Sequence, residues 1–205
     1  CLQNLAYDQF YCEHIYVFST LALREVLKSF KLEIFDVENT KTHGGSNRYY
    51  IKKNTNSLYK INNRVNAEIK KELQFGLNKF STYQKFAKNV KISKSKLLKI
   101  FSSLNKKKLR IIGYGATAKS CTVLNYCGLG KSDIKYFYDT TSYKVNKYLP
   151  GSKILIKKYK KLDNKEIDVA FLGAWNFKKE IFKKEKKFIE GGGKFITHVP
   201  NPSII

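Results

Sequence analysis

Residues 110–139 combine two glycines, a lysine and an acid at a spacing suited to nucleotide binding. Gly113 and Gly115 follow an apolar run and allow a tight turn with close approach of the backbone to a ligand. Lys119 brings a cation to the start of the helix that should follow, where free N–H groups attract a phosphate. Asp139 lies 24 residues beyond Gly115 (139 − 115), close to the position of an acid that binds ribose hydroxyl groups.

The pattern around this turn predicts a strand, a helix and a second strand. Residues 109–112 and 134–138 are apolar runs of strand type, and Thr117 can cap the helix between them. Ala118 stands where the dinucleotide-binding fingerprint has its third glycine, which is an accepted variant. The alternative is a tight turn in a sheet that binds nothing, but the joint occurrence of turn, cation and acid favours a ligand.

A second group of residues offers side chains for acid–base chemistry near neutral pH: Tyr11, Glu13 and His14. Tyr11 and Glu13 share a face if the segment is extended, and Tyr11 and His14 share one if it is helical. From the residues alone, the alternative is that a Tyr and a His beside a run of aromatic residues serve only in packing.

The composition indicates a folded chain with a lysine-rich surface. Of the 205 residues, 42% are apolar, which is enough for a core, and no run approaches the ~18 apolar residues of a membrane helix. We therefore expect a cytoplasmic protein without a membrane partner. The formal net charge is +24, but 36 of the 40 basic residues are lysine, whereas base recognition favours arginine. This argues against a specific nucleic-acid partner.

The four cysteines, Cys1, Cys12, Cys121 and Cys127, show no paired zinc spacing, so we expect no metal site in this chain. Methionine is absent and the sequence opens at Cys1. We therefore expect a fragment of a longer protein.

Hydrophobic periodicity predicts alternating elements along the chain. Expected helices cover residues 17–30, 58–104 with one interruption, and 177–188, and expected strands cover 32–37, 48–51, 153–156, 169–172 and 194–199. A polar linker should follow the second strand, at residues 52–57. Alternation of strand and helix over the second half predicts an α/β fold with a parallel, doubly wound sheet.

Five segments together resemble the SAM-dependent C-methyltransferases that act on nucleotide-linked keto-deoxysugars. They are YCEHIYVFS at 11–19, HGGSNR at 43–48, GYGATAKSCTVLNYCGLG at 113–130, YKVNKYLPG at 143–151 and AWNF at 174–177. The resemblance implies that residues 1–57 end a methyltransferase domain with a helix and two antiparallel strands. Residues 58–205 would then form a Rossmann-like domain, with long N-terminal helices, that binds the nucleotide sugar. SAM would be bound mainly upstream of this chain and zinc by a domain further upstream, so the fragment alone should be inactive.

The resemblance also implies roles for individual residues. Tyr11, Glu13 and His14 become the catalytic candidates, with His14 as the base, Glu13 orienting it or sharing its proton, and Tyr11 bonding the enolate oxygen. The substrate-binding candidates are His43, Gly44, Gly45, Ser46, Arg48, Gly113, Tyr114, Gly115, Ala116, Lys119, Asn125, Asp139, Lys147, Trp175 and Asn176. For residues 43–48 a simple sharp turn is an equal alternative, and Arg48 either contacts an anion or merely sits on a strand.

Two other functions compete with this interpretation. The glycine turn alone fits an NAD(P)-dependent oxidoreductase, but no Tyr-x-x-x-Lys pair accompanies it, and the motifs before residue 60 would go unexplained. The lysine content alone fits a basic module that binds polyanions with steep salt dependence. The sequence does not specify an oligomeric state.

Overall fold

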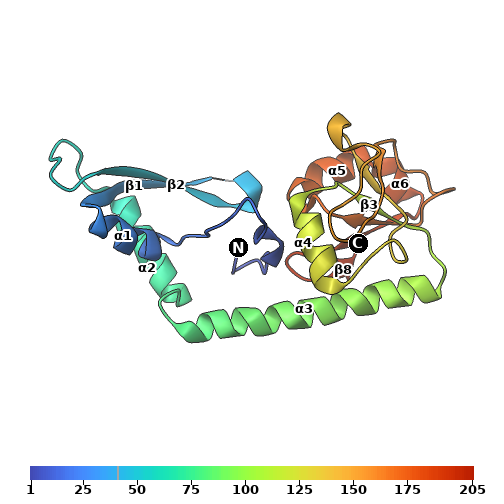
Figure 1. The fold of residues 1–205 in the computed structure, drawn as a ribbon, viewed down its shortest axis with the longest axis horizontal. Helices are drawn as coiled ribbons and strands as arrows, with labels where there is room; N and C mark the ends of the chain where they lie inside the picture. Colours follow the sequence, from blue (N-terminus) through green and yellow to red (C-terminus); the bar gives the residue numbers. More distant parts are fainter. Residues whose placement is uncertain (41) are drawn as a thin grey trace. The chain divides into compact units, whose positions relative to one another are not determined.

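The computed structural model describes residues 1–40 and 42–205, which form two compact units (Figure 1). One unit, here called the glycine-turn unit, combines Cys1–Ile15 with Asn89–Ile205, and the other, the hairpin unit, is Tyr16–Lys88. The first 15 residues thus pack with the C-terminal part of the chain. The sequence-based division at residue 57 stays a prediction.

The hairpin unit consists of two helices and a two-stranded antiparallel sheet. Its elements are α1 (Thr20–Ser29), β1 (Leu32–Thr40), the 3-10 turn η2 (Thr42–Gly44), β2 (Ser46–Lys53) and α2 (Asn63–Phe75). An isolated hairpin has little stability in water, so it depends on the helices that cover it. Leu27 of α1, Ile34 and Val37 of β1, and Val65 of α2 are buried together in that contact.

A buried carboxylate ties the two helices of the hairpin unit together. Glu72 of α2 accepts hydrogen bonds from the backbone N–H groups of Thr20 (2.7 Å) and Leu21 (2.8 Å). Ser19 caps the same helix end through the N–H of Ala22. The start of α1 carries unpaired N–H groups and a positive partial charge, and Glu72 satisfies both.

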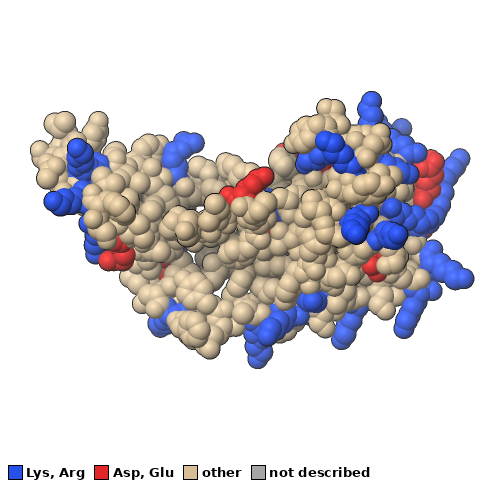
Figure 2. Space-filling view, in the orientation of Figure 1, with Lys and Arg blue, Asp and Glu red and all other residues tan. Residues whose placement is uncertain are grey.

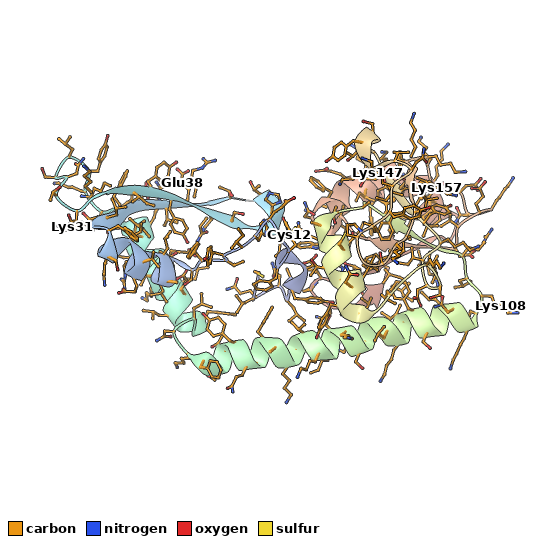
Figure 3. The ribbon with its side chains drawn as sticks, in the orientation of Figure 1. Cys12, Lys31, Glu38, Lys108, Lys147 and Lys157 are labelled. Carbon is orange, nitrogen blue, oxygen red and sulfur yellow. The ribbon has the colours of Figure 1, made fainter. Side chains whose placement is uncertain are left out.

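The long helix α3 (Phe80–Lys106) follows α2 after a break, and its residues belong to both units. Gly76 ends α2 in the left-handed conformation (φ 85°), and Phe80 opens the next helix. The expected interruption therefore falls at residues 76–79, and the first helix begins at Asn63, capped by Asn62, rather than at residue 58. Figure 3 labels Lys108, where the chain leaves α3 for the second sheet.

The glycine-turn unit is built on a six-stranded sheet with the order β5-β4-β3-β6-β7-β8. The strands are β3 (Ile111–Tyr114), β4 (Phe137–Asp139), β5 (Ile156–Lys158), β6 (Val169–Leu172), β7 (Lys194–Thr197) and β8 (Ser203–Ile204). All neighbours are parallel except β7 and β8. The remaining elements are the helices α4 (Ala118–Cys127), α5 (Lys178–Lys184) and α6 (Lys186–Glu190), and the 3-10 turns η1 (Tyr7–Gln9), η3 (Ser142–Lys144) and η4 (Trp175–Phe177).

Helices cover both faces of this sheet. On one face Phe101 of α3 packs against Phe171 of β6, with ring centroids 6.0 Å apart. On the other face Phe188 of α6 packs against Phe195 of β7 at 5.7 Å. All four rings are almost completely buried. Successive side chains of a strand point to opposite faces of the sheet, so continuously apolar strands make both faces apolar.

The strand order creates a switch point between β3 and β6. The chain runs outward from β3 through β4 to β5, then returns to the other side of β3 to form β6. Connections therefore diverge at the carboxyl ends of β3 and β6. Open α/β sheets bind ligands in the crevice at such a point.

The α/β fold class is confirmed: a helix with two antiparallel strands precedes a mostly parallel, doubly wound sheet. Several local predictions were wrong in detail; for example, the strands expected at 109–112 and 134–138 lie at Ile111–Tyr114 and Phe137–Asp139. The strand expected at 153–156 lies at Ile156–Lys158, the helix expected at 177–188 is divided among η4, α5 and α6, and the last strand ends at Thr197. The antiparallel strand β8 was not anticipated, because two residues are too few for a periodic signal.

Basic side chains are spread over the visible face of both units in Figure 2, and acidic ones are few. Within the described residues, no helix combines the length and the apolar character needed to cross a membrane.

Candidate active site

The glycine turn joins β3 to α4 at the switch point. Gly115 has φ 86°, and a Cβ at this position would lie 2.8 Å from the Cβ of Ala174, which follows β6. Thr117 caps α4, since its Oγ1 accepts from the N–H of Ser120 (3.1 Å). The turn therefore needs glycine for its backbone angle and for close packing against the neighbouring strand, as the sequence predicts.

Asp139 holds this turn from the end of β4. Its Oδ2 accepts from the N–H of Ala116 (2.8 Å) and its Oδ1 from the N–H of Thr141 (2.8 Å). Lys144 donates to the carbonyl oxygen of Ala116 (2.9 Å), and its ammonium lies 4.0 Å from the Asp139 carboxylate. Asp139 therefore fixes the turn's shape, whereas its predicted contact with ribose stays a prediction.

Lys119 lies in the first turn of α4 with only 5% of its surface exposed. Its ammonium lies 5.1 Å from the centre of the Trp175 ring and 3.4 Å from Asn176 Oδ1. Burial lowers the pKa of Lys119, while the charge of Asp8 acts in the opposite direction. Lys119, Trp175 and Asn176, all predicted from sequence, thus lie together at the carboxyl ends of β3 and β6.

A buried carboxylate that the sequence analysis missed completes this edge. Asp8 in η1 accepts hydrogen bonds on Oδ2 from the indole N–H of Trp175 (2.5 Å) and from His198 Nε2 (2.9 Å). Asp8 and His198 are both fully buried. One available signal was the position of His198 directly after the last parallel strand, where α/β sheets gather polar groups.

The catalytic candidates follow η1 in the same unit, and the backbone at Phe10 reaches α4. Thr122 of α4 contacts the carbonyl oxygen of Phe10 at 3.5 Å. Tyr11 and His14 form a pair, with the Tyr11 hydroxyl 2.9 Å from His14 Nε2 and the ring centroids 4.0 Å apart. Glu13 is exposed. The charge of Glu13 adds to burial in raising the pKa of the Tyr11 phenol.

The hydrogen bonds of His14 define its tautomer. Nδ1 lies 2.8 Å from the carbonyl oxygen of Gln9, which can only accept, so Nδ1 carries the proton. In the neutral ring, Nε2 then has a lone pair that accepts from the Tyr11 hydroxyl. His14 Nε2 and the Tyr11 hydroxyl thus form a hydrogen-bonded pair through which a proton can pass.

Tyr114 and Asn125 have structural partners. The Tyr114 hydroxyl donates to Glu185 (3.0 Å) inside the core, and Asn125 donates to the carbonyl oxygen of Pro150 (3.1 Å). Lys147 is exposed on the loop between η3 and β5 (Figure 3). The predicted substrate contacts of Tyr114, Asn125 and Lys147 stay predictions. Because the side chain of Tyr114 is in the core, only its backbone is available for a contact at the turn.

The residues of the HGGS turn lie in the hairpin unit, between β1 and β2. His43, Gly44 and Gly45 all have positive φ (53°, 89° and 124°), so the sharp turn itself requires this sequence. Ser46 donates to the carbonyl oxygen of Thr42 (3.1 Å), and Arg48 lies 3.6 Å from Glu38 on the facing strand. The turn and substrate-contact interpretations both stay open.

The described residues include no metal cluster, and a hollow on the surface lies away from the predicted site residues. No cluster of three His, Cys, Asp or Glu side chains suited to a metal ion occurs in the described ranges. A hollow of 630 Å³ lies along α3, lined by residues such as Leu98, Lys99 and Lys106. It contains none of the predicted site residues.

A family model described as the C-methyltransferase C-terminal domain matches residues 41–200. The C-methyltransferase NovU of Streptomyces niveus is 31% identical over 204 residues, covering 100% of this chain and 48% of that protein. The chain therefore spans about half the length of this curated relative.

Proposed function

Because the chain belongs to the C-methyltransferase C-terminal domain family, we propose that it is the C-terminal portion of a SAM-dependent sugar C-methyltransferase. The substrate is a nucleotide-linked deoxysugar with a ketone, and the methyl group enters at a carbon next to that ketone. When bound, SAM supplies the methyl group, and the half of the enzyme that precedes this chain holds it. This chain holds the nucleotide sugar and provides the base.

The observation that carries the proposal is the Tyr11–His14 pair in the same unit as the glycine turn. A carbon next to a ketone becomes nucleophilic when its proton is removed, which requires a base near neutral pH. His14 Nε2 is the candidate for this base, and the Gln9 carbonyl holds its other nitrogen as N–H.

The Tyr11–His14 hydrogen bond supports one route for the proton. The resemblance implied that Tyr11 bonds the enolate oxygen, but its hydroxyl occupies the His14 lone pair, so in this proposal the Tyr11 oxygen takes the α-proton as its own proton passes to Nε2. The products are an enolate, a neutral tyrosine and an imidazolium ion. A concerted transfer avoids a free tyrosinate, which the raised pKa of Tyr11 disfavours.

The nucleotide part binds at the carboxyl ends of β3 and β6. The N–H groups of Ala118 and Lys119 have no acceptor within their own helix, because they are the first two of α4. Together with the Lys119 ammonium they offer three donors to a diphosphate. Such a site binds and orients the substrate without taking part in bond making.

Exchange of the α-proton tests the base without depending on methyl transfer. The full-length enzyme is incubated in D₂O with a nucleotide-linked keto-deoxysugar and no SAM, and deuterium at the α-carbon is followed by NMR. We expect enzyme-dependent exchange, and none with the sugar whose ketone has been reduced to an alcohol. If no exchange occurs at any of the pH values tested between 6 and 9, the proposal is contradicted.

Binding measurements test the division of labour. Calorimetric titration of the 205-residue chain should show saturable binding of a nucleoside diphosphate sugar and much weaker binding of SAM. The reverse order of affinities would overturn the assignment of the nucleotide site to this chain.

A further inference from the structure

Asp8 lies where three distant parts of the glycine-turn unit meet. Its Oδ2 accepts from Trp175, 167 residues away, and from His198, 190 residues away in the sequence. Tyr7, its neighbour in η1, packs its ring against Tyr126 of α4 (5.6 Å) and against His198 (6.1 Å). η1 is thus fastened to α4 and to the carboxyl ends of β6 and β7.

A short chain of bonds leads from Asp8 to the base. Gln9, the last residue of η1, gives its carbonyl oxygen to His14 Nδ1 (2.8 Å). That bond determines which nitrogen of His14 carries the proton and how the ring is turned. Because Asp8 anchors η1, it also determines where the Gln9 carbonyl lies.

The contact is costly as a purely structural device. Asp8 Oδ1 and His198 Nδ1 are buried without a hydrogen-bond partner among the described residues. A buried carboxylate with an unpaired oxygen destabilises a fold, and an apolar contact of similar volume often serves as well or better. Glu185 of the same unit is a buried carboxylate, 2% exposed, whose two oxygens both have hydrogen-bond partners. It accepts from the hydroxyl groups of Tyr114 (3.0 Å) and Tyr159 (2.6 Å) and from the N–H of Leu162 (3.0 Å).

On these grounds, and resting on the proposed function, we propose that Asp8 is a positioning residue for the Tyr11–His14 pair. Through the Gln9 carbonyl, Asp8 fixes the tautomer and the orientation of the His14 ring. Through its hydrogen bonds with Trp175 and His198, it fixes the position of the Tyr11–His14 pair relative to the carboxyl ends of β6 and β7. Asp8 itself touches neither substrate nor the reacting atoms.

The first test reads the His14 tautomer directly. The 205-residue chain, with three histidines, is labelled with ¹⁵N-histidine, and each ring is assigned by single substitution. In the wild type we expect His14 in the Nδ1–H form, and in Asp8→Asn a mixture of both tautomers with a mobile ring. An unchanged Nδ1–H signal in Asp8→Asn would overturn the proposal.

The second test uses kinetics of the full-length enzyme with a matched control. Asp8→Asn should lower kcat by roughly 10- to 100-fold and change the KM for the nucleotide sugar by less than about 3-fold. Glu185→Gln removes a buried carboxylate of the same unit, so it should lower the Tm at least as much yet leave kcat within about 2-fold at permissive temperature. Loss of kcat in proportion to loss of Tm in both variants would mean a merely structural role for Asp8.

Two further variants keep the outcome decisive. If Asp8→Asn does not fold, Trp175→Phe is used instead, because it removes the indole N–H that donates to Asp8 and keeps an aromatic ring. We then expect a smaller fall in kcat and a partial mixture of the two His14 tautomers. His14→Gln separates the two proposals. If it leaves α-proton exchange intact, the proposed function fails; if it abolishes exchange while Asp8→Asn does not alter kcat or tautomer, only the role of Asp8 fails.

Discussion

The two ends of the six-stranded sheet use their polar side chains differently. At the amino end, Arg110 before β3 and Asp168 before β6 form a bidentate ion pair. Arg110 Nε lies 3.0 Å from Asp168 Oδ2, and Arg110 Nη2 lies 2.7 Å from Asp168 Oδ1. Arg110 also donates to the carbonyl oxygens of Asn164 (2.9 Å) and Lys165. These groups satisfy one another, so they contribute to stability.

At the carboxyl end the polar groups are less well matched. Among the described residues, Lys119 is buried without a carboxylate within ion-pair distance, and Asp8 has one oxygen without a hydrogen-bond partner. Charged groups that are buried and only partly paired can gain hydrogen bonds and ion pairs when a ligand binds, which is typical of functional sites. Charged groups in this unit therefore stabilise the fold at one end of the sheet and, as proposed, bind a ligand at the other, and the five predictions that follow separate these two roles.

The largest expected effect concerns His14, the proposed base. His14→Gln in the full-length enzyme should lower the rate of α-proton exchange by about 10²–10⁴-fold, because it removes the proton acceptor. Tyr11→Phe should lower it by a similar factor if the proton passes through the Tyr11 hydroxyl. A mild loss in Tyr11→Phe beside a large loss in His14→Gln would indicate direct abstraction by His14.

The next effect concerns nucleotide affinity. Lys119→Met should weaken binding of the nucleoside diphosphate by roughly 10- to 100-fold in calorimetry, since it removes a charged donor. Lys131→Met, an exposed lysine of the same unit, is the control and should change affinity by less than about 2-fold. Equal losses in both variants would mean that only the general positive charge attracts the ligand.

Lys119→Met should also stabilise the free protein. Burial lowers the pKa of Lys119 in the folded state, so the charged form costs stability at neutral pH. That cost disappears as the pH rises past about 10.4, the ordinary lysine pKa. The Tm advantage of Lys119→Met should therefore be largest near pH 7 and vanish above pH ~10; a constant difference would contradict this account.

At the amino end, Asp168→Asn should lower stability by about 1 kcal/mol without altering nucleotide affinity. Arg110 lowers the pKa of Asp168, so the ion pair stabilises the fold above about pH 4, and this contribution is lost as the pH falls through the lowered pKa. Urea unfolding at pH 7 and pH 3 should show a difference between wild type and variant that shrinks at the lower pH. A change in affinity would place this end within the site.

Thr117→Ala should cost about 1 kcal/mol, because it removes the cap of α4 and the bond to the carbonyl oxygen of Gly173 (3.2 Å). Thr140→Ala, an exposed threonine nearby, should be neutral in the same unfolding measurement. Equal effects would show that the cap has no special weight.

Much of the nucleotide edge could be predicted from sequence, because its signals are local. The Gly115 turn and the Thr117 cap depend on residues close in sequence, and the structure has them as expected. The preceding strand runs to Tyr114, so Gly113 belongs to β3 and not to the turn. The roles of Tyr114 and Asn125 could not be predicted in this way. Strand alternation directs Tyr114 into the core, and Asn125 meets Pro150 only after the chain has folded back.

The sequence by itself determined the alternation of strands and helices and the glycine turn, because each depends on near neighbours, and side-chain chemistry alone made Tyr11, Glu13 and His14 the proposed acid–base residues. Only the tertiary structure decided that Asp8 pairs with Trp175 and His198, and that the first 15 residues join the C-terminal unit. Contacts across more than 160 residues depend on how the whole chain closes its loops and packs its core, and no local pattern encodes that.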